Sequence, residues 1–370
     1  MSSPGSDEHA LPSGWVLVVG AGLVGTSVAL ALARRQVVVH MQDTDPLHAA
    51  VASSRLPRAA PESASGPGLV VVATPPDQLA GAIAAALRTY PTAVVTDVGS
   101  VKSKPLSDLR AQRGGRPPAG LDLSSYVGGH PMAGSERSGP LAAAGDLFEG
   151  RTWAVTPHEE SSSAATAAVE ALAAICGAVV VRMDPGEHDE AVARTSHLPH
   201  LMAALTAGRL YGAPAPQLAL SGQGVRDVTR IAAGSPQLWR QIVGANAQAL
   251  RGLLRDVRRD VDELLVSLDS GDLRAVERLL ESGATAAATI PGRHGGPAED
   301  LVAVTVTIPD RAGALGELFE VVGSLGVNVE DVRIDHDPAR EFGLVEVDVA
   351  AGAGAGLAQS LRERGWAAHR

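Results

Sequence analysis

Apolar runs and helical stretches alternate through the first half of the chain. Residues 15–46 pass from a fully apolar run ending at Gly20, through a glycine-rich turn and an Ala/Leu-rich stretch, to a second β-branched run ending at Asp43. These features predict a strand, a helix and a strand. Later runs are largely apolar throughout, as in strands covered on both faces, so residues 14–184 are predicted to form a doubly wound α/β sheet. The further strand-like runs are 69–76, 93–100, 126–131, 152–157 and 178–183.

Strands disappear from the pattern after about residue 184, and residues 185–289 are predicted to be all-α. The stretch 235–270 predicts one continuous helix of about 33 residues, roughly 50 Å long. Such a helix exceeds what the core of one subunit needs, which favours a helical dimer interface over an intramolecular bundle. Its apolar face comprises Leu250, Leu253, Leu254, Val257, Val261, Leu264, Leu265 and Leu268.

Two segments read as connections or tails, and a third as a small module. Residues 1–13 are predicted to be a disordered tail, and residues 290–300, rich in glycine and proline, a linker. Alternating apolar residues from Val302 to Ile308, followed by a helix, two strands, a helix and a last short strand, predict a compact βαββαβ module of ferredoxin-like type over 301–370.

Composition narrows the classes of protein that this chain can be. A length of 370 residues suggests two or three domains, and a net charge of −10 with scattered basic residues argues against nucleic acid or anionic membrane as partners. The acidic start does not resemble a secretory signal, and no run predicts a membrane span. A lone Cys176 in an apolar run is interpreted as a buried structural thiol in a reducing, cytoplasmic setting.

The hexapeptide GAGLVG supplies Gly20, Gly22 and Gly25 at the spacing of a dinucleotide-binding turn. The first glycine permits the tight turn, the second lets the backbone approach a pyrophosphate, and the third allows close helix packing. Leu23 and Val24 open the helix whose free N–H groups would face the anion, and Thr74 lies in the strand-like run 69–76. This context favours a Rossmann-type domain with a bound dinucleotide over a merely structural turn.

Asp43, at the end of the second strand, bears on the type of dinucleotide. A carboxylate there accepts hydrogen bonds from ribose hydroxyls and repels a 2′-phosphate, so NAD is predicted rather than NADP. Arg34 and Arg35 at the end of the preceding helix weaken that preference, although solvated helix-end charges explain them more simply.

His130 lies at the end of a predicted strand, in the motif GGHPMAGSERSG. Ligands of such sheets bind beyond the carboxyl ends of the strands, where a histidine can accept a proton from an alcohol whose carbon gives up hydride. The plain alternative is a loop histidine that caps a backbone group. The glycines before it are expected to let substrate and nicotinamide approach the backbone, and Ser100 also lies at a strand end.

Further polar residues occur in the helical part. Ser196, His197 and His200 stand in SHLPH, but no carboxylate or thiol cluster completes a metal site, and no metal is predicted. Arg230 and Trp239 belong to DVTRIAAGSPQLW. By default, Arg230 is a surface ion-pair residue and Trp239 a packing residue.

GAGLVGTS, TDVGSVKSK, GGHPMAGSERSG, SHLPH and DVTRIAAGSPQLW, in this order, closely resemble the prephenate/arogenate dehydrogenase family of tyrosine biosynthesis. The resemblance covers roughly residues 14–290. DRAG and GVNVEDV in the last module resemble an ACT domain, which binds amino acids in other enzymes.

The family resemblance implies the NAD-dependent oxidative decarboxylation of a small-molecule substrate with a cyclohexadienyl ring. It also implies a homodimer. It implies that His130 accepts the hydroxyl proton, that Ser100 hydrogen-bonds His130 or the substrate and helps seat the nicotinamide, and that Arg230 pairs with a substrate carboxylate. The remaining residues that it implies are Ser135, Glu136 and Asp227 as a polar gate, Ser196 and His200 as pocket lining, and Trp239 near a neighbouring subunit's site.

The choice between prephenate and arogenate depends on an ammonium group, which arogenate alone carries on its side chain. Glu187, Asp189 and Glu190 offer acids near the predicted pocket, and Asp189 is the candidate to bind that ammonium; a helix N-terminal acidic set is the alternative. Gln223 departs from the glycine-rich pattern of the family, which leaves specificity open. Prephenate is the first expectation and arogenate the second.

Asp310, Gly313 and Asn328 stand where the ACT resemblance implies an amino-acid effector, with tyrosine feedback expected and a silent structural module as the alternative. Two other functions compete. A hydroxy-acid dehydrogenase of the 6-phosphogluconate kind relies on a lysine in its helical domain, and this chain has none after Lys104. A non-catalytic amino-acid sensor holding NAD would not need His130, Ser100 and Arg230 together.

Overall fold

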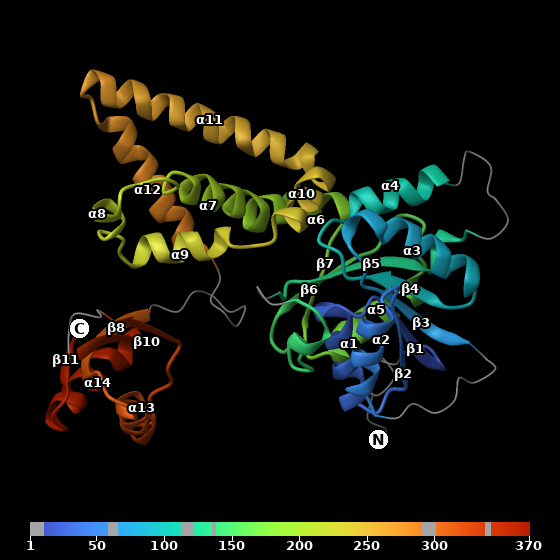
Figure 1. Cartoon of the computed structure of the whole chain (residues 1–370), viewed down its shortest axis with the longest axis horizontal. Coiled ribbons are helices and arrows are strands. Elements are labelled where there is room, and N and C mark those ends of the chain that lie inside the picture. Colours follow the sequence, from blue (N-terminus) through green and yellow to red (C-terminus); the bar gives the residue numbers. More distant parts are fainter. Residues whose placement is uncertain (1–10, 58–65, 113–120, 135–137, 291–300, 337–341) are drawn as a thin grey trace, which may run out of the picture. The chain divides into compact units, whose positions relative to one another are not determined.

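The chain forms two compact units in a computed structural model, residues 1–263 and residues 264–370. Figure 1 labels their helices and strands. The boundary falls inside the long helix α11 (Ala247–Ser270) rather than at the predicted linker. The predicted linker lies almost wholly outside the described residues, as does most of the predicted N-terminal tail. The structure describes residues 11–57, 66–112, 121–134, 138–290, 301–336 and 342–370.

A seven-stranded sheet organises the first unit, in the order β2-β1-β3-β4-β5-β6-β7. Six of the seven strands lie within the predicted runs, and β3 begins two residues before its run, so the predicted α/β sheet is confirmed. All neighbours pair in parallel except β5 and β6, which are antiparallel. The strands are β1 (Trp15–Val19), β2 (Val39–Gln42), β3 (Pro67–Val72), β4 (Val94–Asp97), β5 (Tyr126–Pro131), β6 (Thr152–Thr156) and β7 (Val179–Arg182).

Helices cover both faces of this sheet, and alternate strand residues point to opposite faces. Val18 packs in one core cluster with α1 and α5, whereas Leu17, its neighbour in the chain, packs in a second cluster with α3 and α4. This two-sided burial explains why the strands are apolar throughout. The helices are α1 (Leu23–Arg34), α2 (Pro46–Ser54), α3 (Pro76–Thr89), α4 (Ser103–Gln112) and α5 (Ser163–Ile175).

Helices alone follow the sheet, as predicted, but the expected single long helix is wrong. The chain breaks it at Asn246, where φ is −110°, into one helix of 10 residues and one of 24. A π-helical turn also interrupts the path from α6 to α7. The elements are α6 (Pro185–Val192), the π turn η3 (Ala193–His197), α7 (Leu198–Gly208), α8 (Ala215–Leu218), α9 (Gln223–Ala232), α10 (Pro236–Ala245), α11 (Ala247–Ser270) and α12 (Arg274–Ala288).

The C-terminal module has the predicted βαββαβ order and forms an antiparallel sheet β11-β8-β10-β9. Alternate residues of β8 and β10, such as Val304, Val306 and Val345, are buried against α13 and α14. This confirms a ferredoxin-like module, while its interpretation as an ACT domain stays a prediction. The elements are β8 (Leu301–Pro309), α13 (Ala314–Ser324), β9 (Asp331–His336), β10 (Phe342–Ala350), α14 (Ala351–Glu363) and β11 (Ala367–His369).

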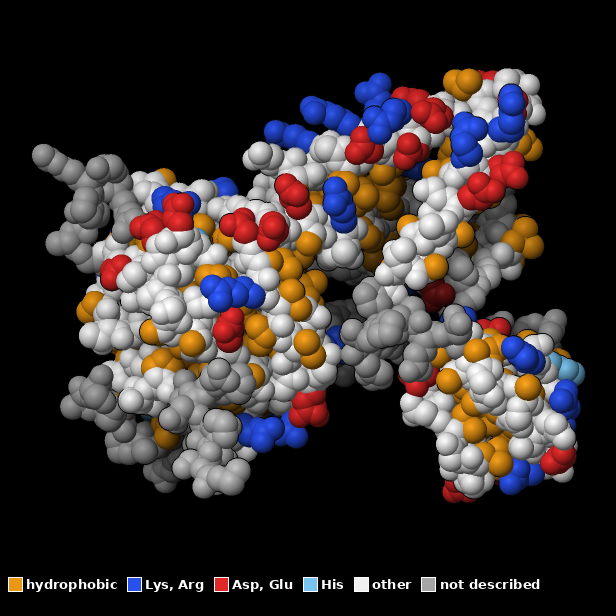
Figure 2. All heavy atoms as spheres, turned by 180° about the vertical axis from the view of Figure 1, so that it is seen from behind, with side chains coloured by type: hydrophobic (Ala, Val, Ile, Leu, Met, Phe, Trp, Pro, Cys, Tyr) orange, Lys and Arg blue, Asp and Glu red, His pale blue; other side chains and the backbone are white. Residues whose placement is uncertain are grey.

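The described helices include none that is both long and apolar enough to cross a bilayer. The surface of the long helices instead mixes charged and hydrophobic side chains, as Figure 2 shows from behind.

Candidate active site

The glycine-rich turn connects β1 to the first turn of α1, and its glycines are required by close packing. Gly20 has φ +107°, and a Cβ there would lie 2.4 Å from the carbonyl oxygen of Ala73. A Cβ on Gly25 would lie 2.1 Å from the carbonyl oxygen of Gly20. At Gly22, by contrast, a Cβ would meet nothing within 4 Å. Packing against the backbone therefore requires glycine at Gly20 and Gly25, whereas the space beside Gly22 is open and suits the close approach of a ligand.

Three features at this turn fit a dinucleotide. The N-cap of α1, Gly22, provides no side-chain hydrogen bond, so the first amides of the helix, at Leu23 and Val24, stay available to an anion. Asp43 lies beside the turn, where its Oδ2 accepts from the N–H of Ala21 at 2.6 Å. The hydroxyl of Thr74 is buried and has no hydrogen-bond partner among the described residues, so it is available to a ligand.

His130 lies near the end of β5, at the edge where β4 also ends. The glycines before it have a different reason from the one expected. A Cβ on Gly129 would lie 2.8 Å from the carbonyl oxygen of Asp97 and 2.9 Å from Nε1 of Trp153. They let β5 pack against the protein itself, and the prediction that they admit substrate and nicotinamide is not supported.

A chain of two hydrogen bonds runs from His130 into α6. Its Nδ1 lies 2.9 Å from Nε2 of His188, and Nδ1 of His188 lies 2.9 Å from Oδ1 of Asp189. Burial, and then the nearby charges of His188 and Lys102, hold the pKa of His130 well below 6.5. Burial also lowers the pKa of His188. His130 is therefore neutral at pH 7 and able to accept a proton.

Asp189 does not face a ligand, contrary to the hypothesis that it binds a substrate ammonium. It is 5% exposed, and its carboxylate accepts from the backbone N–H groups of Lys102 at 2.8 Å and Ser103 at 2.9 Å, besides His188. Although burial opposes ionisation, these hydrogen bonds keep the pKa of Asp189 below its ordinary value.

A second buried network lies under His130, and sequence reasoning missed it. The ammonium of Lys102 contacts Oδ1 of Asp97 and donates to the carbonyl oxygen of Gly129 at 2.7 Å. The hydroxyl of Tyr126 donates to Oδ2 of Asp97 at 2.8 Å, and burial, then the charge of Asp97, raises its pKa well above 10. Only the short spacing from Asp97 to Lys102 in the sequence hinted at this ion pair.

The SHLPH segment forms a third cluster, held around Trp239 at the start of α10. The ring of His200 stacks on that of Trp239, with centroids 3.6 Å apart and planes at 9°. His197 meets the same indole edge-on, and its Nδ1 lies 3.1 Å from Nδ2 of Asn246. Burial lowers the pKa of His197 to about 4. The half-buried Ser196 lies in the π turn, a distortion found frequently at functional sites.

Both histidines of this cluster pack against the indole ring of Trp239. Within the described parts of the chain, no group of three or more His, Cys, Asp or Glu side chains is arranged to hold a metal ion.

Arg230 and its expected neighbours are less closely placed. Arg230 is exposed on α9, a helix that packs against α7, the helix of His200. Asp227 on the same helix accepts from Nε2 of Gln223 at 3.1 Å, so the residue that departs from the family pattern engages one member of the expected gate. Ser135 and Glu136 lie outside the described residues.

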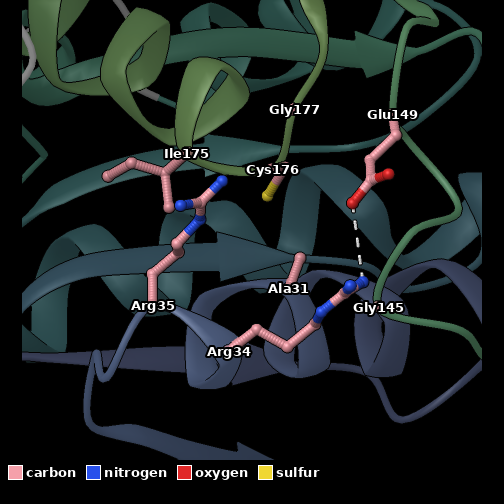
Figure 3. Close-up of a pocket in the computed structure, with 8 residues that line it drawn as sticks. All are labelled: Ala31, Arg34, Arg35, Gly145, Glu149, Ile175, Cys176 and Gly177. Atoms are coloured by element: carbon pink, nitrogen blue, oxygen red, sulfur yellow. Dashed lines mark ion pairs between the residues drawn. The ribbon is translucent and has the colours of Figure 1, made fainter.

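Two hollows in the first unit are lined by residues that the sequence analysis singled out. One of about 290 Å³ lies between α3, α4 and α10 and is lined by Ser100, which places this residue at an accessible wall. Another of about 510 Å³ lies at the C-terminal ends of α1 and α5 (Figure 3). In this hollow a guanidinium nitrogen of Arg34 lies 3.5 Å from Oε1 of Glu149. Burial raises the pKa of the Cys176 thiol to about 12.

The larger hollow is remote from the glycine-rich turn, since it lies at the opposite end of α1. The arginines complement the negative end of the helix dipole, as the simpler interpretation of Arg34 and Arg35 predicted. Cys176 is buried, as predicted.

Two family models match consecutive parts of the chain. The prephenate dehydrogenase nucleotide-binding domain matches residues 28–182, and the prephenate dehydrogenase dimerization domain matches residues 184–282. The chain is 34% identical over 364 residues to NovF of Streptomyces niveus, named a probable prephenate dehydrogenase, covering 95% of this chain and 99% of that one. It is 27% identical to the prephenate dehydrogenase of Bacillus subtilis, covering 86% and 87%.

Solved structures give the same result for the fold. A prephenate dehydrogenase from A. aeolicus, in complex with hydroxyphenyl propionate and NAD+, matches with a TM-score of 0.64 at 27% identity, covering 75% of this chain and 99% of that one. Arogenate dehydrogenase from Synechocystis matches with a TM-score of 0.60 at 27% identity, covering 74% and 98%.

Proposed function

Because this chain belongs to the prephenate dehydrogenase family, we propose that it oxidises and decarboxylates prephenate to 4-hydroxyphenylpyruvate, with NAD as hydride acceptor. The observation that carries this proposal is the placement of a neutral His130 at the carboxyl edge of a sheet whose glycine-rich turn is open to a dinucleotide. Arogenate is the alternative substrate.

The cofactor is NAD, which supplies the acceptor for the hydride when bound. Gly20, Gly22 and Gly25 shape the turn that would hold it, and the amides of Leu23 and Val24 would face its phosphates. Asp43 would accept from its ribose hydroxyls, and the unpartnered hydroxyl of Thr74 would hydrogen-bond it.

His130 would act as a general base toward the hydroxyl of the substrate. As that carbon loses hydride, the hydroxyl proton passes to His130; loss of carbon dioxide then turns the ring into a phenolate. The phenolate needs one proton, so His130 returns what it took and the reaction releases no net proton to water. A base that is neutral before and after the reaction matches the lowered pKa of His130.

The remaining site residues are assigned by the same proposal. Ser100, which follows β4, would contact His130 or the substrate hydroxyl and the nicotinamide, as the family resemblance implies. Arg230 would pair with a carboxylate, a task for which its planar fork is suited. Ser135, Ser196, His200 and Trp239 would line the pocket, and the stacked pair of His200 and Trp239 would form one wall of it.

The structure gives a reason to place prephenate before arogenate. Of the three acids that the sequence offered for an ammonium, Asp189 is buried and engaged, and Glu187 closes the capping box of α6 by accepting from the N–H of Asp184 at 3.1 Å. Only the exposed Glu190 remains of these three. Prephenate, which carries a ketone there, needs no such acid.

Initial rates of NAD reduction with prephenate and with arogenate, in separate reactions, test the proposal. We expect turnover with both or with prephenate alone, and a kcat/KM that favours prephenate. A preference for arogenate would contradict the substrate assignment, and no reduction with either substrate by folded protein would contradict the proposed function.

Three further assignments belong to this proposal. The protein is a homodimer, which its match to a dimerization domain supports. It works in the cytoplasm. Its C-terminal module is an ACT domain that binds tyrosine, with Gly313 in the left-handed turn at the start of α13 and Asp310 and Asn328 nearby in the chain. Titration calorimetry with tyrosine, phenylalanine and tryptophan tests the last point, and an absence of heat with all three would contradict it.

A further inference from the structure

Two hydrogen bonds connect His130 to His188 and His188 to Asp189, and they determine which ring nitrogen of His130 is free to react. We infer that His188 and Asp189 are positioning residues that hold His130 with its proton on Nδ1, so that Nε2 presents its lone pair to the substrate. The inference rests on the proposed function only for the role of His130 as a base. The protonation pattern itself is a property of the free protein.

The carboxylate of Asp189 is ionised and can only accept hydrogen bonds. It accepts at Oδ1 from the backbone N–H of Lys102 and at Oδ2 from that of Ser103. Its Oδ1 also lies 2.9 Å from Nδ1 of His188. That nitrogen must therefore carry a proton and donate it.

The position of the proton on His188 then determines the position of the proton on His130. A neutral imidazole carries one N–H, so His188 with its proton on Nδ1 has a lone pair on Nε2. Nε2 of His188 lies 2.9 Å from Nδ1 of His130, which must supply the proton for that hydrogen bond. The rings meet at 68°, an edge-on arrangement that brings the two nitrogens together. His130 is left with an unprotonated Nε2.

The arrangement is rigid because different elements hold it. His188 is 1% exposed, and Asp189 on the same helix is tied to the loop between β4 and α4, which also carries Ser100. The side-chain amide of Asn246 donates to the backbone carbonyl oxygen of Asp189 at 2.7 Å. The buried ring of His188 is thus held from both sides, as a device that orients a base requires.

Charge around His130 also makes this device useful. The ammonium of Lys102 donates to the carbonyl oxygen of Gly129, next to His130, and opposes a positive charge on the ring. The carboxylate of Asp189, one ring further away, favours the imidazolium that forms when His130 takes the substrate proton. His188 and Asp189 thus both orient the base and stabilise its charged state, as the aspartate does in serine protease triads.

Nitrogen-15 NMR of the histidine side chains in the full-length protein tests the tautomers without any turnover. At pH 7.5 we expect both His130 and His188 to be neutral, with protonated Nδ1 and unprotonated Nε2. Spectra of His130→Asn and His188→Gln assign the two rings. A proton on Nε2 of His130 in the unchanged protein would overturn the inference, whether or not the protein oxidises prephenate.

Three variants test the consequence for rate. Asp189→Asn places an amide beside His188 and removes the ionised acceptor, so we expect a fall in kcat of about two to four orders of magnitude, as for the wrong tautomer in a related triad. His188→Gln keeps an acceptor near the position of Nε2, and His188→Leu keeps none. We therefore expect the Gln variant to retain more activity than the Leu variant.

His158→Gln is the matched control, because this histidine is also buried but contacts none of His130, His188 and Asp189. We expect it to leave kcat within about twofold. Equal kcat in folded Asp189→Asn and unchanged protein, or equal losses in His188→Gln and His188→Leu, would contradict a positioning role. No activity in the unchanged protein would contradict the proposed function instead, and the NMR result would still decide the tautomer.

Discussion

At the scale of single residues, the environment of His130 predicts an unusual pH profile. Burial and the charges of His188 and Lys102 lower its pKa, so the neutral, basic form persists below pH 6.5. Because kcat/KM reports ionisations of the free enzyme, we expect it to stay level from pH 8 down to 6.5 and to fall only at more acid pH. An acid limb with its midpoint at or above 6.5 would contradict this account.

Lys102 gives a second prediction at this scale. It is 1% exposed and pairs with the fully buried Asp97. Removing one partner leaves an uncompensated buried charge, so Lys102→Met should lower the free energy of unfolding by about 3–5 kcal/mol. Urea unfolding followed by tryptophan fluorescence measures the loss.

Two comparisons sharpen the Lys102 test. Lys104→Met removes an exposed lysine that pairs with Asp108, and its effect should stay within about 0.5 kcal/mol. Adding Asp97→Asn to Lys102→Met should recover part of the lost stability, because no buried charge is then left alone. A double variant less stable than Lys102→Met would contradict the buried-charge explanation.

At the scale of elements, the close contact between β5 and β4 predicts a cost for any side chain at Gly129. A Cβ there would lie 2.8 Å from the backbone of β4, so Gly129→Ala should destabilise the protein by about 1–3 kcal/mol and lower kcat by shifting His130. Gly81→Ala is the matched control in the exposed middle of α3, where nothing lies within 4 Å, and it should stabilise by about 0.5–1 kcal/mol. Thermal unfolding of the three proteins side by side decides the point, and equal shifts would contradict it.

Elements also show what sequence could and could not predict. The seven strands were predictable because both faces of the sheet are covered, which makes each run apolar. The break between α10 and α11 was not, since Asn246 ends a helix here through long-range hydrogen bonds to His197 and the backbone of Asp189. A local pattern of apolar residues continues across it unchanged.

The candidate site was predictable to a similar depth. His130 and the glycine-rich turn stand in motifs whose chemistry is local, so their positions followed from the sequence. Lys102 reads as a surface lysine, and Asp189 as one of several acids at a helix start, until folding brings the loop after β4 against α6. Buried networks between distant segments leave almost no trace in one sequence.

At the scale of the whole molecule, the long helix α11 predicts self-association. Its apolar side is buried at the start, at Leu250, but exposed further along, with Leu265 at 55% and Leu268 at 61%. A second copy of the chain would cover these side chains, as the match to a dimerization domain suggests. Figure 2 shows such hydrophobic side chains beside charged ones on the long helices.

We expect light scattering to report a dimer for the unchanged protein and a monomer, or a much weakened dimer, for Leu265→Glu combined with Leu268→Glu. Arg258→Glu, a change of charge at an exposed position of the same helix, serves as the control and should leave the dimer intact. A monomeric unchanged protein would contradict the assignment.

Product stoichiometry tests whether His130 is the base of an NAD-dependent oxidative decarboxylation. NADH, carbon dioxide and 4-hydroxyphenylpyruvate are measured from prephenate with the unchanged protein and with folded His130→Asn. The account predicts equal amounts of the three products, and a kcat at least about a hundredfold lower in the variant, the typical contribution of a general base. Unequal products, or a variant as fast as the unchanged protein, would contradict it.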